Sequence, residues 1–212
     1  MIETKQKLLD TAERLIAEQG YAATSLRHII SEAGVNLAAV HYHFGSKEDL
    51  LDQVILQKVS GVNTARLALL DRLESAAVGA PLPVADVLGA FFEPMIQAAG
   101  RNPQFVKLMG RMFAEGLLPS IAAKHFHPTF VRFAEALRRS LPFLSQEELC
   151  WRLQFMIGAM SHALCGPSLL PEGFQTGTTS PNFRPPDFVN IVRRLMTFLC
   201  GGFQAPPCPE IR

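Results

Sequence analysis

The chain has 212 residues, of which 48% are hydrophobic and 18% are charged, and its formal net charge is +1. This length suffices for one large domain or two small ones. The balance excludes an intrinsically disordered protein, which needs few apolar and many charged residues. Because the charged fraction is below the ~25% usual in soluble domains, we expect part of the surface to be buried against a second copy of the chain.

No apolar run approaches the ~20 residues of a membrane span, and residues 1–5 lack the segments of a signal peptide. We therefore expect a soluble, cytoplasmic protein with no membrane contact. The cysteines are too widely spaced for a metal or redox motif, and histidines one residue apart point to different faces of a helix. We expect reduced thiols, no metal and no cofactor. The cysteines are Cys150, Cys165, Cys200 and Cys208.

Four N-terminal segments carry apolar residues at helical spacing. They are Leu8–Ile16, Leu26–Ala33, Val40–Phe44 and a longer one from Leu50 to about Leu73. Residues three and four apart share one face of a helix, so each segment predicts a helix with one buried side. Three short helices followed by a long one predict a small head of residues 1–46.

The boundaries of these helices are marked by glycines and by polar caps. Glycine tolerates the left-handed conformation in which helices commonly stop, and a serine or asparagine accepts from the free N–H groups of a first turn. The predicted stops are Gly20, Gly34 and Gly45. The predicted caps are Ser25, Asn36 and Ser46, the last with Asp49 as its acidic partner.

Prolines and caps divide the remainder into longer helices, and all 15 prolines lie at or after Pro81. No alternation typical of strands appears, so the predicted fold is all-α, with a helical-bundle body of residues 47–212. We predict a loop over residues 166–186 and a disordered tail over residues 206–209. The expected helices are opened by Pro81-Leu82-Pro83 (to about Ala99), by Asn102-Pro103, by Leu118-Pro119, by Ser145 (to about Leu164) and by Asp187 (to about Cys200).

Residues 24–47 contain the pattern that carries the function: two short helices joined by a turn at Gly34, with another helix before them. This is the arrangement of a helix-turn-helix. The second helix begins at Asn36 and has a middle of small side chains, which allow close approach to base edges and contact with thymine methyl groups. Tyr42, His43 and Lys47 can donate to phosphates, as can the N–H groups at helix starts.

The motifs Ala33-Gly34-Val35, Tyr42-x-Phe44 and Lys47-Glu48-x-Leu50, behind Thr24-Ser25-Leu26, resemble the N-terminal domain of the TetR family of bacterial transcriptional regulators. The resemblance covers about the first quarter of the chain. It implies an all-helical dimer with a DNA-binding head and a ligand-binding body. The implied phosphate contacts are Thr24, Ser25, Tyr42, His43 and Lys47, the implied groove contacts are Asn36, Leu37, Ala38, Ala39 and His41, and Val40 and Phe44 are implied to be core.

The head is not basic, since residues 1–60 hold six basic and eight acidic side chains. Nonspecific DNA binding depends on cations that neutralise phosphates, so binding must rely on placement, with Arg27 and Lys47 on one face. The second helix has no Arg or Lys for bidentate guanine contacts. We expect apolar and histidine contacts, readout of DNA shape, and a dimer that doubles the site.

Fourteen of the 15 phenylalanines lie after residue 80, in helices that are apolar on more than one face. Such helices are buried on several sides, which is compatible with core alone or with a pocket for a small hydrophobic effector. Arg111 and Glu115 are four apart, so they can pair or contact a ligand. Pro94 and Pro128 are expected to kink their helices. The predicted ligand-binding residues are Phe92, Met95, Met109, Arg111, Phe113, Phe155 and His162.

The last two helices have apolar stripes with few charges, and in the resembled family such helices form the dimer interface. A two-fold dimer places two DNA-reading helices about one DNA turn apart, or a multiple of it, which predicts a near-palindromic operator in double-stranded DNA. The residues assigned to a homodimer interface by the resemblance are Leu149, Leu153, Ile157, Val192, Leu195 and Leu199.

The predicted function is that of a ligand-responsive repressor, in which the effector and the operator each weaken the binding of the other. Repression itself is implied by the family. The alternative is a helical ligand-binding or protein-interaction module that does not read DNA, which the acidic head favours. An enzyme is not expected, since the sequence shows no nucleophile–base pair, phosphate loop or metal cluster.

Overall fold

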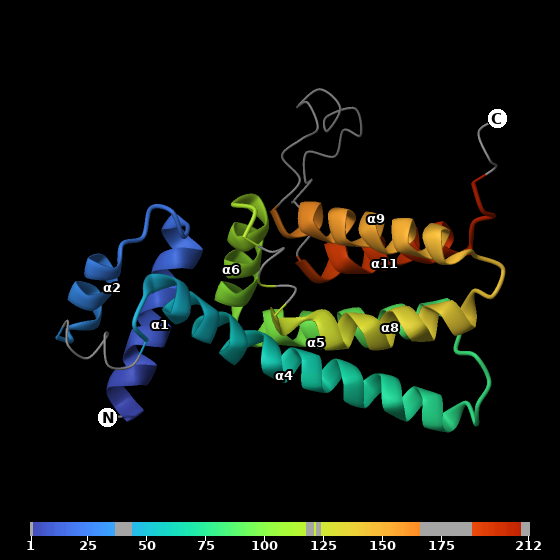
Figure 1. Cartoon of the computed structure of the whole chain (residues 1–212), viewed down its shortest axis with the longest axis horizontal. Coiled ribbons are helices and arrows are strands. Elements are labelled where there is room, and N and C mark those ends of the chain that lie inside the picture. Colours follow the sequence, from blue (N-terminus) through green and yellow to red (C-terminus); the bar gives the residue numbers. More distant parts are fainter. Residues whose placement is uncertain (1, 37–43, 118–120, 122–123, 166–187, 209–212) are drawn as a thin grey trace, which may run out of the picture.

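The computed structural model describes residues 2–36, 44–117, 121, 124–165 and 188–208. These residues form helices and no strands, which confirms the all-α prediction (Figure 1). No helix in these ranges is long and apolar enough to cross a membrane. The head contains α1 (Ile2–Gln19) and α2 (Leu26–Ala33), followed by the long α4 (Lys47–Ala76). The body contains α5 (Val84–Arg101), α6 (Pro103–Ala114), α8 (His127–Ser140), α9 (Gln146–Cys165) and α11 (Phe188–Gln204).

The predicted apolar stripes of the head form its core. Leu8, Leu15 and Ile16 of α1 are at most 1% exposed, as is Ile29 of α2, and Phe44 is buried beside them. The predicted stops at Gly20 and Gly34 are confirmed, because each follows a helix and has a positive φ angle. Gly45 also has a positive φ angle, but the helix that it was predicted to end lies outside the described residues. The predicted cap at Ser46 is also confirmed, since its Oγ accepts from the Asp49 N–H group at 3.0 Å.

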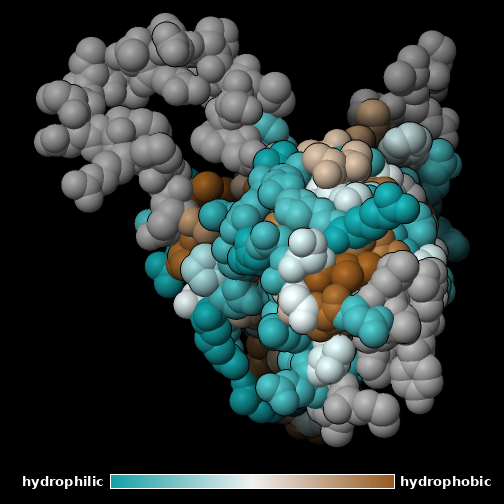
Figure 2. Space-filling view, turned by 90° about the vertical axis from the view of Figure 1, so that its left-hand side faces the viewer, coloured by the Kyte–Doolittle hydropathy of each residue, from teal (hydrophilic) through white to brown (hydrophobic). Residues whose placement is uncertain are grey.

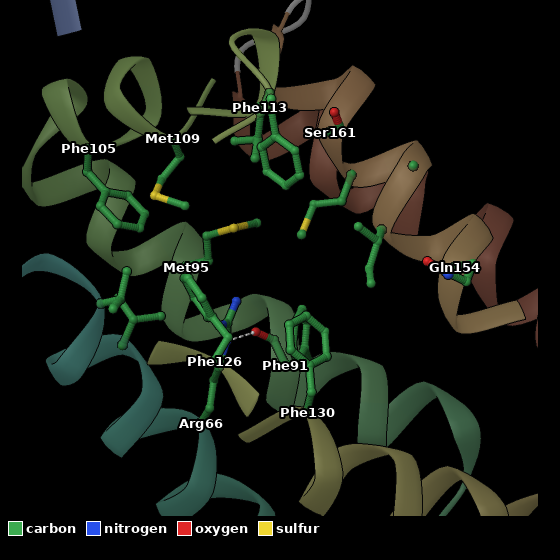
Figure 3. Close-up of a pocket in the computed structure, with 17 residues that line it drawn as sticks. Arg66, Phe91, Met95, Phe105, Met109, Phe113, Phe126, Phe130, Gln154 and Ser161 are labelled. Carbon is green, nitrogen blue, oxygen red and sulfur yellow. Dashed lines mark hydrogen bonds between the residues drawn. The ribbon is translucent and has the colours of Figure 1, made fainter. Parts of the chain in front are cut away.

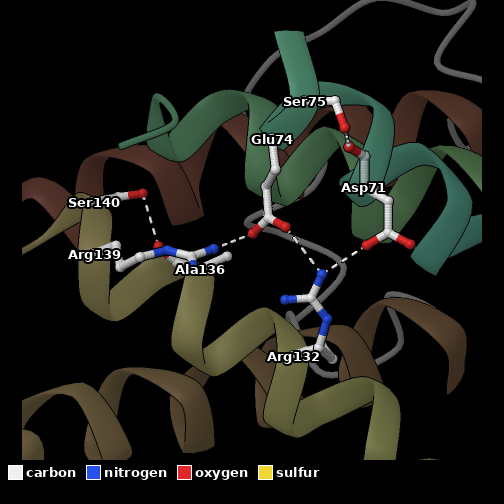
Figure 4. Close-up of polar contacts among 7 residues, drawn as sticks. All are labelled: Asp71, Glu74, Ser75, Arg132, Ala136, Arg139 and Ser140. Atoms are coloured by element: carbon white, nitrogen blue, oxygen red, sulfur yellow. Dashed lines mark hydrogen bonds and ion pairs between the residues drawn. The ribbon is translucent and has the colours of Figure 1, made fainter. Parts of the chain in front are cut away.

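Helix α4 joins the head to the body, because it packs on α1 near its start and on α5 and α8 farther along (Figure 1). The boundary after residue 46 stays a prediction. Figure 4 shows how the end of α4 is held: Arg132 of α8 donates to Asp71 at 2.6 Å and to Glu74 at 2.9 Å, and Arg139 also pairs with Glu74. These carboxylates raise the pKa of Arg132, chiefly through the hydrogen bond to Glu74.

Helices α9 and α11 lie side by side and form the other layer of the body. The predicted cap at Ser145 is confirmed by a 3.1 Å bond from the Glu148 N–H group. Helix α11 extends to Gln204, past the predicted end at Cys200. The prediction of a disordered tail is wrong for Pro206, because its carbonyl accepts from the buried Arg152, which also binds the carbonyls of Gly202, Phe203 and Ala205.

Two prolines of the body, Pro94 and Pro128, were expected to kink their helices. Pro128 lies in the first turn of α8, where a missing N–H group costs nothing, so the predicted kink is wrong there. Pro94 lies inside α5 and is buried, and the kink predicted there stays a prediction. The predicted loop over residues 166–186 and the start of a helix at Pro119 fall outside the described residues.

Candidate DNA interface and effector cavity

The first helix of the predicted pair, α2, and the turn after it have the local geometry that a helix-turn-helix requires. Ser25 caps α2, since its Oγ accepts from the His28 N–H group at 3.1 Å. At the other end Gly34 has a φ of 62°, and its N–H group bonds back to Ile30 and Ser31. This left-handed residue turns the chain sharply toward Asn36. Seen from the head end, the described surface is largely hydrophilic with an apolar area near its centre (Figure 2).

Some of the predicted DNA contacts lie on this surface. Ser25, Arg27 and Asn36 are exposed, and Lys47 is half-buried at the start of α4. The predicted contacts Leu37, Ala38, Ala39, His41, Tyr42 and His43, and the predicted core residue Val40, lie outside the described residues.

Thr24 is placed differently from the prediction. It is 0% exposed, and its hydroxyl donates to the Gly20 carbonyl at 2.7 Å. The hydroxyl therefore holds the turn between α1 and α2 together, and a phosphate would have to displace this bond and open the turn to reach it. The Thr24 hydroxyl is therefore not presented to a phosphate in this geometry, and the phosphate contact predicted for Thr24 stays a prediction.

Lys47 connects the same turn to α4. Its ammonium group donates to the Tyr21 carbonyl at 2.5 Å and lies 3.9 Å from the centroid of the Tyr21 ring. The Tyr21 hydroxyl donates to Glu48 at 3.0 Å. Burial, with the hydrogen bond and the charge of Glu48, raises the pKa of Tyr21 to about 12. Lys47 has three donors, so it can orient the turn and still donate to a phosphate.

Four of the eight acidic residues in residues 1–60 are paired with cations. Glu13 contacts Lys58 at 2.6 Å, and Asp52 contacts Lys124 of the body at 2.7 Å. Arg14 pairs with both Glu18 and Glu32. Because these pairs take up cations as well as carboxylates, residues 1–60 stay net negative, and DNA binding depends on where the cations lie.

The body contains a partly open cavity of about 590 Å³, lined by residues of α4, α5, α6, α8 and α9 (Figure 3). This volume is typical of a small-molecule site. Its wall is almost wholly apolar and aromatic, with Arg66, Gln154 and Ser161 as the polar side chains. The apolar lining residues are Val59, Val62, Phe91, Met95, Phe105, Met109, Phe113, Phe126, Phe130, Ile157, Met160 and Leu164.

Three of the seven predicted ligand residues, Met95, Met109 and Phe113, line this cavity. The other four, Phe92, Arg111, Phe155 and His162, do not line it. Phe92 is 0% exposed and belongs to the core. Arg111 reaches toward the head, and Phe155 and His162 lie on the outer side of α9. Helical spacing identified apolar faces correctly, but it could not say which face turns inward.

Arg66 was missed by the sequence reasoning, although it is 3% exposed and lines the cavity. Its Nε donates to the Phe91 carbonyl at 2.8 Å, and its Nη1 donates to Asn63 at 3.1 Å. A signal was present, since Arg66 stands four residues after Val62 and four before Leu70 on the buried stripe of α4. A cation at such a position is rarely buried without a reason.

Helix α6 connects this cavity to the head. Glu115, directly after α6, accepts from the Tyr21 and Ala22 N–H groups at 2.9 Å each. Arg111 donates to the Glu18 carbonyl at the end of α1. At the start of α6, Asn102 donates to Glu13 of α1 at 3.0 Å. Arg111 and Glu115 thus contact α1 and the turn after it, and the structure gives no pair between them.

The outer side of α9 and α11 carries exposed aromatic residues. Trp151, Phe155 and Phe198 are 54%, 65% and 70% exposed, and the first two rings stack at 6.0 Å. A shallow hollow lies between the helices, lined by Ala159, His162, Ala163, Ile191, Arg194, Leu195 and Phe198. We call this the α9/α11 face. It is continuous, because residues 151, 155, 159 and 162 share one side of α9.

The predicted interface residues are mostly not on the α9/α11 face. Leu149, Val192 and Leu199 are at most 5% exposed within the single chain, so the prediction is wrong for them. Ile157 lines the cavity and Leu153 packs against the core, whereas Leu195 borders the hollow. A stripe of apolar residues shows that a face is buried, but not whether the same chain or a partner buries it.

These features define a class of protein: an all-helical chain with a helix-turn-helix head on a body that contains an apolar cavity. The family model "Bacterial regulatory proteins, tetR family" matches residues 8–54, and the model "Tetracyclin repressor-like, C-terminal domain" matches residues 89–202. The second match alone spans more than half of the chain. The chain therefore belongs to the TetR family of bacterial transcriptional regulators.

Similar proteins agree with this assignment. The regulator AcrR of Shigella flexneri is 44% identical over 52 residues, 24% of each chain. The nicotine-responsive repressor HdnoR of Paenarthrobacter nicotinovorans is 44% identical over 50 residues, 24% of this chain and 26% of its own. These matches span about a quarter of the curated relatives. A solved TetR-family regulator from Shewanella sp. PV-4 has the same fold, with a TM-score of 0.64 at 19% identity over 94% of this chain and 97% of its own.

Proposed function

We propose that this protein is a ligand-responsive transcriptional repressor in the bacterial cytoplasm. It binds a near-palindromic operator as a homodimer, and a largely hydrophobic small molecule that enters the body cavity releases it. Family membership supports the DNA-binding role, and the apolar cavity supports the effector. Repression is supported by the similarity to the nicotine-responsive repressor HdnoR, although that match spans only 50 residues.

The proposed DNA contacts are arranged around the helix pair. Arg27, Ser25 and Lys47 contact phosphates, together with the N–H groups at the start of α2, which favour anions. Asn36 contacts the major groove. The proposal also keeps Leu37, Ala38, Ala39, His41, Tyr42 and His43 as groove and phosphate contacts, on the strength of their match to the family motif.

The observation that carries the proposal is that α6 contacts both the cavity and the head. Phe105, Met109 and Phe113 line the cavity on one side of this helix. Glu115 binds the turn between α1 and α2 from its end. A ligand that shifts α6 to accommodate its own volume therefore pulls on the turn ahead of α2. The ligand favours one of two head orientations, and operator DNA favours the other.

Dimerisation uses the α9/α11 face in this proposal. Large aromatic side chains exposed together are unusual on a monomer and common at the centre of an interface. The two-fold dimer then presents two heads to successive major grooves, which accounts for a palindromic operator.

Selection of bound duplexes from a random DNA pool, with the purified protein at low salt, tests the DNA-binding part. The proposal predicts a two-fold symmetric consensus with half-sites about one or two helical turns apart. A folded, dimeric, ligand-free protein that enriches no sequence would contradict it, and the interaction-module alternative would then replace it.

A further inference from the structure

Among the described residues, Arg66 is the only guanidinium on the wall of the body cavity. It extends from α4, and Figure 3 shows its nitrogen atoms beside Phe91 at one side of the cavity, across from Gln154 and Ser161. The guanidinium carbon lies 3.9 Å from the centroid of the Phe91 ring. The cation is therefore surrounded by hydrocarbon and aromatic groups rather than by water.

The neutral groups around Arg66 do not balance its charge. Its two hydrogen-bond acceptors in the described residues are the Phe91 carbonyl and the Asn63 side chain. Asn63 is itself held by other polar groups, since its Nδ2 donates to the His125 carbonyl at 2.9 Å. No carboxylate in the described ranges lies within ion-pair distance of the guanidinium, which has five N–H groups to satisfy.

Comparison with the other buried arginine makes the difference clear. Arg152 is 7% exposed and pairs with Glu148 at 2.7 Å while it binds four carbonyls. Arg66 is 3% exposed and has neither a carboxylate nor such a set of carbonyls. Burial lowers the pKa of Arg66 to about 9, as expected for an uncompensated cation. Buried cations are normally paired, yet Arg66 has no counter-ion among the residues that the structure describes.

We infer that Arg66 is the counter-ion for the effector, which is a monoanionic acid with an apolar tail, such as a carboxylate. The acid group binds the free N–H groups of the guanidinium in the planar, forked geometry that suits a carboxylate. The tail lies among the Phe and Met side chains of α5 and α6. The cavity of about 590 Å³ lies within the ~300–1,000 Å³ range of small-molecule pockets, which leaves room for such a tail. This inference rests on the proposed function, because it assigns the effector to the same cavity.

Decanoate and 1-decanol form a matched pair of probes, because they share the same tail and differ in charge. Each is titrated against protein carrying the neutral fluorophore N-phenyl-1-naphthylamine, whose displacement reports occupancy of the cavity. We expect decanoate to displace the fluorophore at a concentration roughly tenfold to a hundredfold lower, as charge-assisted hydrogen bonds imply. In Arg66→Met this preference disappears, while decanol binds as in the parent.

Arg132→Met is the matched control, because it removes the same charge from the surface of α8, away from the cavity. It is expected to keep the preference for decanoate. Equal binding of the two probes by the parent would overturn the inference, as would a preference that survives in Arg66→Met. If Arg66→Met does not fold, Arg66→Lys serves instead, since it keeps the charge, loses the fork, and is expected to keep only part of the preference.

Operator binding is measured separately, so that the two proposals fail in different ways. Selective binding of decanoate that leaves operator affinity unchanged would support the assignment of Arg66 and contradict the proposed coupling to DNA. Release from DNA by decanol as readily as by decanoate would support a ligand-responsive repressor and overturn the role of Arg66. Absence of binding by both probes and by the fluorophore would overturn both.

Discussion

The contact between Gly20 and Glu115 predicts an unusually large effect of adding one methyl group. Gly20 has a φ of 90°, and a Cβ atom there would lie 2.3 Å from Oε1 of Glu115. Gly20→Ala therefore strains the backbone, at ~1–2 kcal/mol, and displaces a carboxylate that accepts two N–H groups, at ~1 kcal/mol or more for each. We expect a loss of roughly 3–5 kcal/mol in the free energy of unfolding.

Gly34→Ala is the matched control. Gly34 also has a positive φ, of 62°, but a Cβ atom there would meet nothing within 4 Å. It is expected to cost only the backbone strain, ~1–2 kcal/mol. Urea denaturation followed by circular dichroism, at one fixed protein concentration, measures both variants.

A double-mutant cycle isolates the role of the carboxylate. In a Glu115→Ala background, Gly20→Ala is expected to cost no more than Gly34→Ala, because the clashing atom is gone. If Gly20→Ala instead costs the same with and without Glu115, the carboxylate does not hold the turn, and the proposed connection between α6 and the head loses its main support.

Three other variants test separate parts of the account. Arg152→Met is expected to cost ~3–5 kcal/mol in urea denaturation, because it leaves Glu148 and the carbonyls at the end of α11 without their donor. Although burial alone would raise the pKa of Asp52, hydrogen bonds from Lys124 and His125 lower it overall. The stability that the Asp52 carboxylate contributes is fully present above its ordinary pKa of about 3.9. It is lost as the pH falls through the lower pKa of the folded state. Asp52→Asn is thus expected to lower the free energy of unfolding at pH 7 by ~1 kcal/mol. It is also expected to make this free energy fall less steeply as the pH is lowered. The same dependence on acid pH in the variant and the parent would refute this. Phe198→Ser is expected to weaken dimerisation in sedimentation velocity, whereas Phe143→Ser, at a residue 52% exposed away from the α9/α11 face, is not; equal effects would argue against that face.

Local features of the fold could be predicted because they depend on neighbouring residues. Ser25, Ser46 and Ser145 each accept from the N–H group three residues on, and Gly34 adopts the left-handed conformation that ends α2. Such caps need no distant partner, so the sequence alone indicates where these helices begin and end.

Features that depend on distant partners could not be predicted in this way. Arg111 and Glu115 have the spacing of a helical pair, yet both contact the head more than ninety residues away in the chain. Thr24 matches a motif position associated with phosphate contact, yet its hydroxyl is buried against Gly20. No role was predicted for Arg66, because its position on the cavity wall depends on the packing of five helices.

The central claim is that the cavity and the DNA-binding head are coupled, and operator affinity with and without effector tests it most directly. The measurement uses a fluorescent duplex of the selected operator and the dimeric protein, at one salt concentration, with an effector identified by displacement from the cavity. The account predicts that a saturating effector weakens operator binding at least tenfold, and that operator DNA weakens effector binding by the same factor. An effector that fills the cavity and leaves operator affinity unchanged would contradict it.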